Sequence, residues 1–309
     1  MAAEVILDVR DLRAYYRILK GDVKAVDGVS FQVRRGEIVG IAGESGCGKS
    51  TLAHTLMLRK PPLTHISGQA LFLGRDIMAM GREEFRQLRL RKISIIPQYA
   101  LDALSPTKKL GEFVADLVRE HGIPADRAFW AKVEERLRFV NLDPKVLDQY
   151  PIELSGGMKQ RAIMVVSTIL NPELIIADEI TSALDVSSQR FAASLLVQLR
   201  DEGIIGSAIF ITHDLAILYQ IADSLLIMYG GHIVEAGPVD TIVHEPRHPY
   251  TQALLNSLPK GGVQGKGQRL GGNKGTPPGP LGIGPGGRGW GGGPNPTGGR
   301  RAAPLTGAT

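Results

Sequence analysis

Five short apolar runs divide the first 230 residues of the chain, and segments with helical periodicity fall between them. Runs of this length and continuous hydrophobicity are typical of strands that are buried on both faces. Helical periodicity follows over 188–201 and 214–222. The alternation predicts an α/β protein with a largely parallel sheet. The five predicted strands are 37–43, 93–97, 174–178, 207–212 and 224–229.

The stretch 110–147 interrupts this alternation because it shows helical periodicity and contains no strand-like run. An apolar helical pattern continues over 158–170. We therefore expect an inserted helical subdomain over about residues 99–165.

Composition changes sharply near residue 260. The segment from 261 onward contains half of the 38 glycines and few large apolar residues. Such a segment cannot bury enough apolar surface to offset the entropy cost of ordering it. The sequence predicts one folded unit over 1–258 and a mostly disordered, basic tail over 259–309.

The net charge of +5 comes from this tail. No acidic residue follows Glu245, and seven of the 36 Lys and Arg residues lie at or after position 260. Residues 1–259 contain the other 29 basic residues and all 31 acidic ones, so this part of the chain does not predict a nucleic-acid-binding surface.

Cys47 is the only cysteine, which excludes an internal disulfide and a cysteine-rich metal or cluster site. The chain contains neither a run near the ~20 apolar residues of a membrane span nor a signal-peptide pattern at its start.

The first chemical motif is GESGCGKST, which follows the strand predicted over 37–43. Its Gly43, Gly48, Lys49 and Ser50 match the spacing of a P-loop, whose backbone N–H groups and helix N-terminus surround phosphates. We expect Lys49 to reach the β- and γ-phosphates of a nucleotide and Ser50 to hold Mg²⁺. The other residues expected in this phosphate cradle are Glu44, Ser45, Gly46, Cys47 and Thr51.

The second motif is LIIADE, an apolar strand that ends in two acids at positions 178 and 179. The carboxyl end of a parallel strand is where ligands of such sheets bind. Asp178 therefore suits a Mg²⁺ partner, and Glu179 can polarise an attacking water.

The third motif is LSGGMKQR, in which a serine and two glycines open an apolar helix. Ser155 is a natural helix cap, and the N–H groups at Gly156 and Gly157 look like a second anion cradle.

Together these motifs resemble the nucleotide-binding subunit of ATP-binding cassette (ABC) transporters. The family's order of GESGCGKST, IIPQ, LSGGMKQR, LIIADE, SALD and ITHD is present over about 1–258. The resemblance implies a P-loop NTPase of ABC type, with a mixed, largely parallel core sheet, an N-terminal antiparallel β subdomain and the helical insertion. It also implies ATP and Mg²⁺ as cofactors, and ATP hydrolysis.

The resemblance implies further roles residue by residue. Gln98 is similar to the glutamine that touches Mg²⁺ and the attacking water, and His213 to the histidine that contacts the γ-phosphate. Asp185 resembles the loop acid that communicates between two sites. Tyr16 is expected to stack on adenine, with the adjacent Tyr15 as an open alternative.

In this family the signature serves a second, facing ATPase subunit, and two ATP molecules lie between the pair. The residues expected to complete the partner's nucleotide site are Ser155, Gly156, Gly157 and Gln160. Ile180 departs from the family, which often has proline there, and this should alter the turn more than the chemistry.

Two segments, EPRHPYTQALLNSLP and YALDALSPTKKLGEFVADLV, resemble the oligopeptide/dipeptide/nickel importer ATPases. This implies a paralogous second ATPase, two integral-membrane permease subunits, an extracytoplasmic solute-binding protein and a peripheral place on the cytoplasmic face of the cell membrane. Peptides are the expected cargo, and oligosaccharides or nickel remain alternatives. A non-transport ABC ATPase is disfavoured by the single cassette. His232, His244 and His248 lack ligand spacing and are expected to be surface residues.

Overall fold

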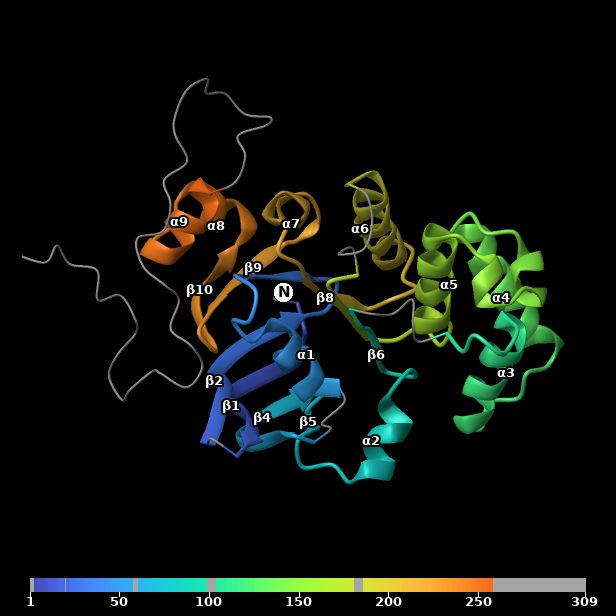
Figure 1. The fold of residues 1–309 in the computed structure, drawn as a ribbon, viewed down its shortest axis with the longest axis horizontal. Helices are drawn as coiled ribbons and strands as arrows, with labels where there is room; N and C mark the ends of the chain where they lie inside the picture. Colours follow the sequence, from blue (N-terminus) through green and yellow to red (C-terminus); the bar gives the residue numbers. More distant parts are fainter. Residues whose placement is uncertain (1–2, 20, 58–60, 99–103, 181–185, 258–309) are drawn as a thin grey trace, which may run out of the picture.

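The core of the computed structural model is a six-stranded sheet in the order β10-β9-β3-β8-β7-β6 (Figure 1). Five strands run parallel, and the edge strand β10 pairs with β9 in the antiparallel direction. The strands are β3 (Ile38–Ala42), β6 (Ile93–Ile96), β7 (Leu174–Asp178), β8 (Ser207–Ile211), β9 (Ser224–Tyr229) and β10 (His232–Pro238). The structure describes residues 3–19, 21–57, 61–98, 104–180 and 186–257.

All five predicted strands are confirmed, and they lie in this one sheet. Burial on both faces explains their continuous hydrophobicity. In β7, Ile175 and Ala177 belong to one buried cluster, whereas Leu174 and Ile176 belong to the other. Successive side chains of a strand point to opposite faces, so a strand between two cores has no polar face.

A second, antiparallel sheet has the order β2-β1-β4-β5 and confirms the expected N-terminal β subdomain. Helix α1 contacts strands of both sheets and fills the space between them with buried Leu52, Leu56 and Met57. The P-loop, which leads into α1, therefore lies where the two sheets and this helix pack together. The strands of this sheet are β1 (Val5–Ile18), β2 (Gly21–Arg34), β4 (Leu63–Phe72) and β5 (Arg75–Asp76).

The helical insertion lies between β6 and β7 and gathers α3, α4 and α5 on one side of the molecule (Figure 1). Helices α8 and α9 lie at the opposite side, near β10. None of the described helices is long and apolar enough to span a membrane. The helices are α1 (Lys49–Met57), α2 (Arg82–Leu88), α3 (Leu110–Glu120), α4 (Arg127–Phe139), η2 (Pro144–Asp148), η3 (Pro151–Glu153), α5 (Gly156–Thr168), α6 (Val186–Asp201), α7 (Leu215–Ile221), α8 (Val239–His244) and α9 (Pro249–Asn256).

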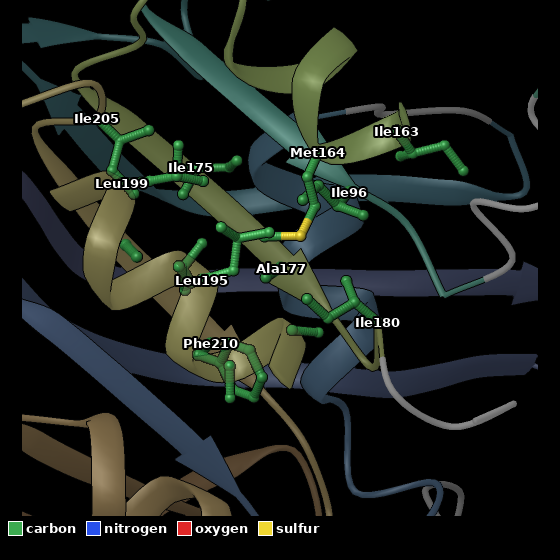
Figure 2. Close-up of a cluster of buried hydrophobic side chains, with 14 of the residues drawn as sticks. Ile96, Ile163, Met164, Ile175, Ala177, Ile180, Leu195, Leu199, Ile205 and Phe210 are labelled. Carbon is green, nitrogen blue, oxygen red and sulfur yellow. The ribbon is translucent and has the colours of Figure 1, made fainter. Parts of the chain in front are cut away.

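The larger hydrophobic cluster joins α5 and α6 to one face of the core sheet (Figure 2). Met164 of α5 points toward Leu195 of α6, above Ala177 of β7. All three side chains are buried. The helix that begins at the LSGG motif thus packs on the core sheet at β6, which neighbours the strand that ends in Asp178. The predicted tail over 259–309 lies outside the described residues, as do the residues around position 100 where the helical subdomain was expected to begin.

Candidate functional site

The P-loop leaves the fully buried strand β3 and ends at the start of α1, as predicted. Gly43, Gly46 and Gly48 have φ values of +151°, +81° and +111°, which side chains rarely adopt. A Cβ atom at Gly43 would lie 2.2 Å from the carbonyl oxygen of Met228, and one at Gly48 would lie 2.1 Å from that of Ala25. Glycine is required at both positions because the chain's own backbone occupies the space.

Lys49 is 4% exposed and folds back over the loop that precedes it. Its Nζ donates hydrogen bonds to the carbonyl oxygens of Gly43 at 2.8 Å and Glu44 at 2.9 Å. Both acceptors are neutral, so the ammonium keeps its full charge for an incoming phosphate.

The rest of the loop contributes mainly backbone. Ser45 and Gly46 form its exposed tip. Cys47 is buried, which raises the pKa of its thiol, and its carbonyl accepts from Gly231 N at 3.0 Å. Thr51 lies in the first turn of α1, and its hydroxyl is 3.2 Å from that of Tyr16. The loop is therefore held by the turn between β9 and β10 as well as by its own helix.

Asp178 and Ser50 meet at the carboxyl end of β7. The Ser50 hydroxyl donates to Asp178 Oδ1 at 2.9 Å. Asp178 is fully buried, and burial raises the pKa of its carboxyl although the Ser50 hydrogen bond opposes the shift. Its second oxygen, Oδ2, is buried and has no hydrogen-bond partner among the described residues. An unpaired buried carboxylate oxygen is costly in an isolated chain, and a cation or its water would satisfy it.

Glu179 follows directly and points toward a different partner. Its Oε2 accepts a hydrogen bond from Gln98 Nε2 at 2.7 Å, which brings together two residues 81 positions apart. Glu179 has a φ of +47°, and its N–H donates to the carbonyl of Ile211 in β8. A non-glycine residue with positive φ is uncommon and needs support from its surroundings. The backbone bond to Ile211 of β8 provides that support.

Tyr15 and Tyr16 have different environments. Tyr15 is buried and its hydroxyl donates to Asp27 at 2.6 Å; burial and then this bond raise the pKa of the phenol to about 12. Tyr16 is half-buried, and its hydroxyl lies 3.2 Å from Thr51 Oγ1 at the start of α1. The structure therefore commits Tyr15 to the fold and leaves Tyr16 beside the P-loop helix. Stacking of Tyr16 on a base stays a prediction.

The signature begins α5 as expected. Ser155 caps the helix by accepting from Met158 N at 3.3 Å. Neither Gly156 nor Gly157 has a positive φ, and a Cβ at either would meet nothing within 4 Å. In Figure 1 this helix lies apart from α1, on the side of the helical insertion. The two glycine-rich motifs of one chain do not converge on one site.

Gln160 has a partner within this chain, and its expected role in a facing subunit's nucleotide site stays a prediction. Its side chain is 6% exposed, and its Nε2 donates to the carbonyl of Ile180 at 2.8 Å. Ile180 is itself buried in the larger cluster. Gln160 thus braces the turn after Glu179 where the family often has proline. Apolar packing around Ile180 draws this amide inward, which a linear motif does not reveal.

The remaining expected residues are divided. His213 is exposed and follows β8, the strand between the P-loop strand β3 and the Glu179 strand β7. Asp185 lies outside the described residues. His248, expected to be an ordinary surface residue, is half-buried and caps α9 by accepting from Tyr250 N at 3.1 Å. A histidine directly before a proline was the available signal for this cap.

Comparison with known proteins decides the family. Residues 26–182 match the family described as ABC transporter, and residues 234–287 match the one described as Oligopeptide/dipeptide transporter, C-terminal region. This chain belongs to the ABC transporter family. It is an ABC ATPase, in agreement with the motifs and the fold.

Curated relatives of this ABC ATPase match it over most of their length. The dipeptide transport ATP-binding protein DppD of Caldanaerobacter subterraneus subsp. tengcongensis is 40% identical over 82% of this chain and 78% of the relative. The oligopeptide transport ATP-binding protein OppD of Bacillus subtilis (strain 168) is 38% identical over 88% of this chain and 77% of the relative. The dimeric structure of MJ0796, a bacterial ABC transporter cassette, has a TM-score of 0.67 at 22% identity and covers 75% of this chain and 98% of that one.

Proposed function

We propose that this chain is the ATP-binding and ATP-hydrolysing subunit of an importer for dipeptides or oligopeptides. One observation carries the proposal: at the end of β7, Asp178 bonds to Ser50 of the P-loop helix, and Glu179 bonds to Gln98. These two bonds support a metal-binding role for the first pair and a water-polarising role for the second, beside the P-loop. The peptide cargo rests on the relatives, which are named as ATP-binding proteins of dipeptide and oligopeptide transport.

Mg²⁺ fits the residues present. Ser50 Oγ and the amide oxygen of Gln98 would be direct ligands, and Asp178 would act through the oxygen that lacks a partner. The described residues contain no group of three His, Cys, Asp or Glu that could hold a metal by itself. The remaining ligands would therefore be phosphates and water, an arrangement typical of Mg²⁺ at nucleotide sites. When bound, the ion neutralises charge on the β- and γ-phosphates.

The other residues supply position and proton chemistry. Lys49, held over the loop by its two carbonyl partners, donates to phosphate oxygens and neutralises developing negative charge. Glu179 polarises the attacking water, and Gln98 holds the Glu179 carboxylate until the nucleotide arrives. His213 meets the γ-phosphate from the end of β8, and Tyr16 stacks on adenine.

The signature at 155–157 completes the site of a second, paralogous ATPase subunit. The open space around Gly156 and Gly157 supports this assignment because none of the described residues requires glycine there. Small residues at a helix N-terminus let a phosphate approach the N–H groups closely. Two ATP molecules would then lie between one subunit's P-loop and the other's signature.

The assembled machine contains two integral-membrane permease subunits and receives cargo from an extracytoplasmic solute-binding protein. This chain lies at the cytoplasmic face of the membrane, and its helical insertion contacts the permeases. ATP binding closes the ATPase pair, and hydrolysis resets it.

Reconstitution tests the proposal. The complete complex is placed in liposomes, and ATP hydrolysis and labelled-peptide uptake are measured with and without peptide-loaded binding protein. We expect both activities to need Mg²⁺, to rise with loaded binding protein and to fall to background in Lys49→Ala. Stimulation by oligosaccharide or nickel in place of peptide would change the cargo class. An assembled complex without ATPase activity would refute the proposal.

A further inference from the structure

The C-terminal helix α9 is fixed against the core by its first residues. The backbone N–H groups of Arg247 and His248 donate to the two carboxylate oxygens of Glu235 in β10, at 2.8 and 3.0 Å. His248 then caps the helix, and Pro249 occupies its first turn, where a missing N–H costs nothing. These contacts set the position of the next residue, Tyr250, with little freedom.

Tyr250 is the largest fully buried side chain among the described residues, with 1% of its surface exposed. Its ring packs on Tyr229 at the end of β9, with the centroids 4.5 Å apart. Its hydroxyl accepts a hydrogen bond from the backbone N–H of Glu44 at 2.9 Å. Burial, the main cause, raises the pKa of the Tyr250 phenol, so the hydroxyl stays neutral. A residue of the C-terminal region thus touches the P-loop across 206 positions of sequence.

The contacted N–H belongs to the peptide group that also carries the Gly43 carbonyl. In a trans peptide the C=O and N–H bonds point in opposite directions. The Gly43 carbonyl accepts from Lys49 Nζ at 2.8 Å, so Lys49 and Tyr250 hold the two sides of one peptide plane. Hydrogen bonds chained through a peptide polarise and strengthen each other. The hydroxyl therefore restrains rotation of the peptide that orients the Lys49 ammonium.

We propose that Tyr250 is a positioning residue of the nucleotide site, whose hydroxyl fixes the Gly43–Glu44 peptide and with it the loop that receives phosphate. The C-terminal region of this chain is then part of the ATP site. This inference rests on the proposed ATP-binding function. It assigns the segment around HPYT a role in the chemistry of the P-loop, in addition to its place in the fold.

The test is Tyr250→Phe, which keeps the ring and its packing and removes the hydroxyl. The matched control is Tyr219→Phe, which removes an exposed tyrosine hydroxyl bonded to His244 at 3.2 Å, away from the P-loop. Binding of MgATP to the full chain is measured by titration calorimetry, and turnover is measured in the assembled complex. A lost hydrogen bond that preorganises a loop predicts a Kd for MgATP about 3- to 10-fold higher in Tyr250→Phe, with kcat within about twofold. Tyr219→Phe should match the wild type in both.

Hydrogen exchange separates positioning from folding. In the nucleotide-free chain, Tyr250→Phe should speed exchange in peptides that contain residue 44 and leave α9 and β9 unchanged. Wild-type affinity and wild-type exchange at the P-loop would overturn the inference. So would faster exchange across α9 together with a lower Tm, because the hydroxyl would then be an ordinary fold contact. Failure of the wild-type chain to bind MgATP would instead refute the proposed function, and the exchange result would still report on the peptide.

Discussion

The P-loop and the signature both contain glycines, but for different reasons. At Gly43 and Gly48 a side chain would meet backbone carbonyls of β9 and β2 at 2.2 and 2.1 Å, and φ is positive at both. At Gly156 and Gly157 a side chain would meet no atom of the described residues within 4 Å, and φ is ordinary. The fold itself requires the first pair. Nothing in the described part of the chain requires glycine at the second pair.

This difference shows that the P-loop is completed by contacts within this chain, whereas the signature is not. The P-loop is a finished cradle, braced by the C-terminal helix and by the turn after β9. The signature is a capped helix end with free space in front of its glycines. When neither a positive φ nor a neighbouring atom of the chain explains a glycine, close contact with another molecule is the favoured explanation. The following predictions test that contrast.

The largest expected effect is the loss of ATP turnover in the variant Glu179→Gln. The variant keeps an acceptor for Gln98 but loses the carboxylate that we propose polarises water, so turnover should fall by at least about 100-fold while ATP still binds. Size-exclusion chromatography with ATP should then show a lasting closed pair of ATPase subunits. The exposed Glu202→Gln serves as the control and should turn over normally. Near-normal hydrolysis in Glu179→Gln would remove this residue from its role.

The next effect compares the two motifs directly in the isolated chain. Gly48→Ala places a Cβ against the Ala25 carbonyl at a φ of +111°, and should lower the free energy of unfolding by about 2–3 kcal/mol. Gly157→Ala should leave it unchanged or raise it by up to about 1 kcal/mol, because alanine favours a helix over glycine. Urea unfolding measures both. Equal destabilisation by the two variants would show that the signature glycines serve this chain's own fold.

A smaller effect should appear in the assembled pair if, as proposed, the two motifs serve different nucleotides. Lys49→Ala removes a charge from the site on this chain's own P-loop, whereas Gly157→Asp places a negative charge against the partner's γ-phosphate. With photo-crosslinkable ATP, Lys49→Ala should reduce the label on this chain about tenfold. The second should lose a similar share on the partner. Loss on this chain alone in both variants would mean that the signature acts in cis.

Much of this architecture could be predicted from local sequence. The five strands, the P-loop turn and the Ser155 cap depend on residues close together in the chain, so a short window contains their cause. The bonds of Tyr250 to Glu44 and of Gln98 to Glu179 could not be placed in the same way. They join residues 206 and 81 positions apart and form only once the sheet order is set. The inward turn of Gln160 has the same origin, since burial of Ile180 creates its acceptor.

The smallest expected effect is a gain in stability from Asp178→Asn. Burial raises the folded-state pKa of this carboxyl, so its charge costs stability as pH rises from the unfolded value of about 4 through the raised folded value. Asparagine keeps an acceptor for Ser50 and removes the charge. The Tm of the nucleotide-free variant should exceed that of wild type by about 2–4 °C at pH 8, and the gain should vanish below about pH 4, where both forms are neutral. The exposed Asp22→Asn should show no such gain in Tm.

The signature should offer no comparable gain, because the Ser155 cap already has its hydrogen bond. Ser155→Ala should lower the free energy of unfolding by about 1 kcal/mol. If Asp178→Asn were no more stable than wild type at pH 8, the buried charge of Asp178 would not destabilise the nucleotide-free chain. A bound cation would then have no such destabilisation to relieve.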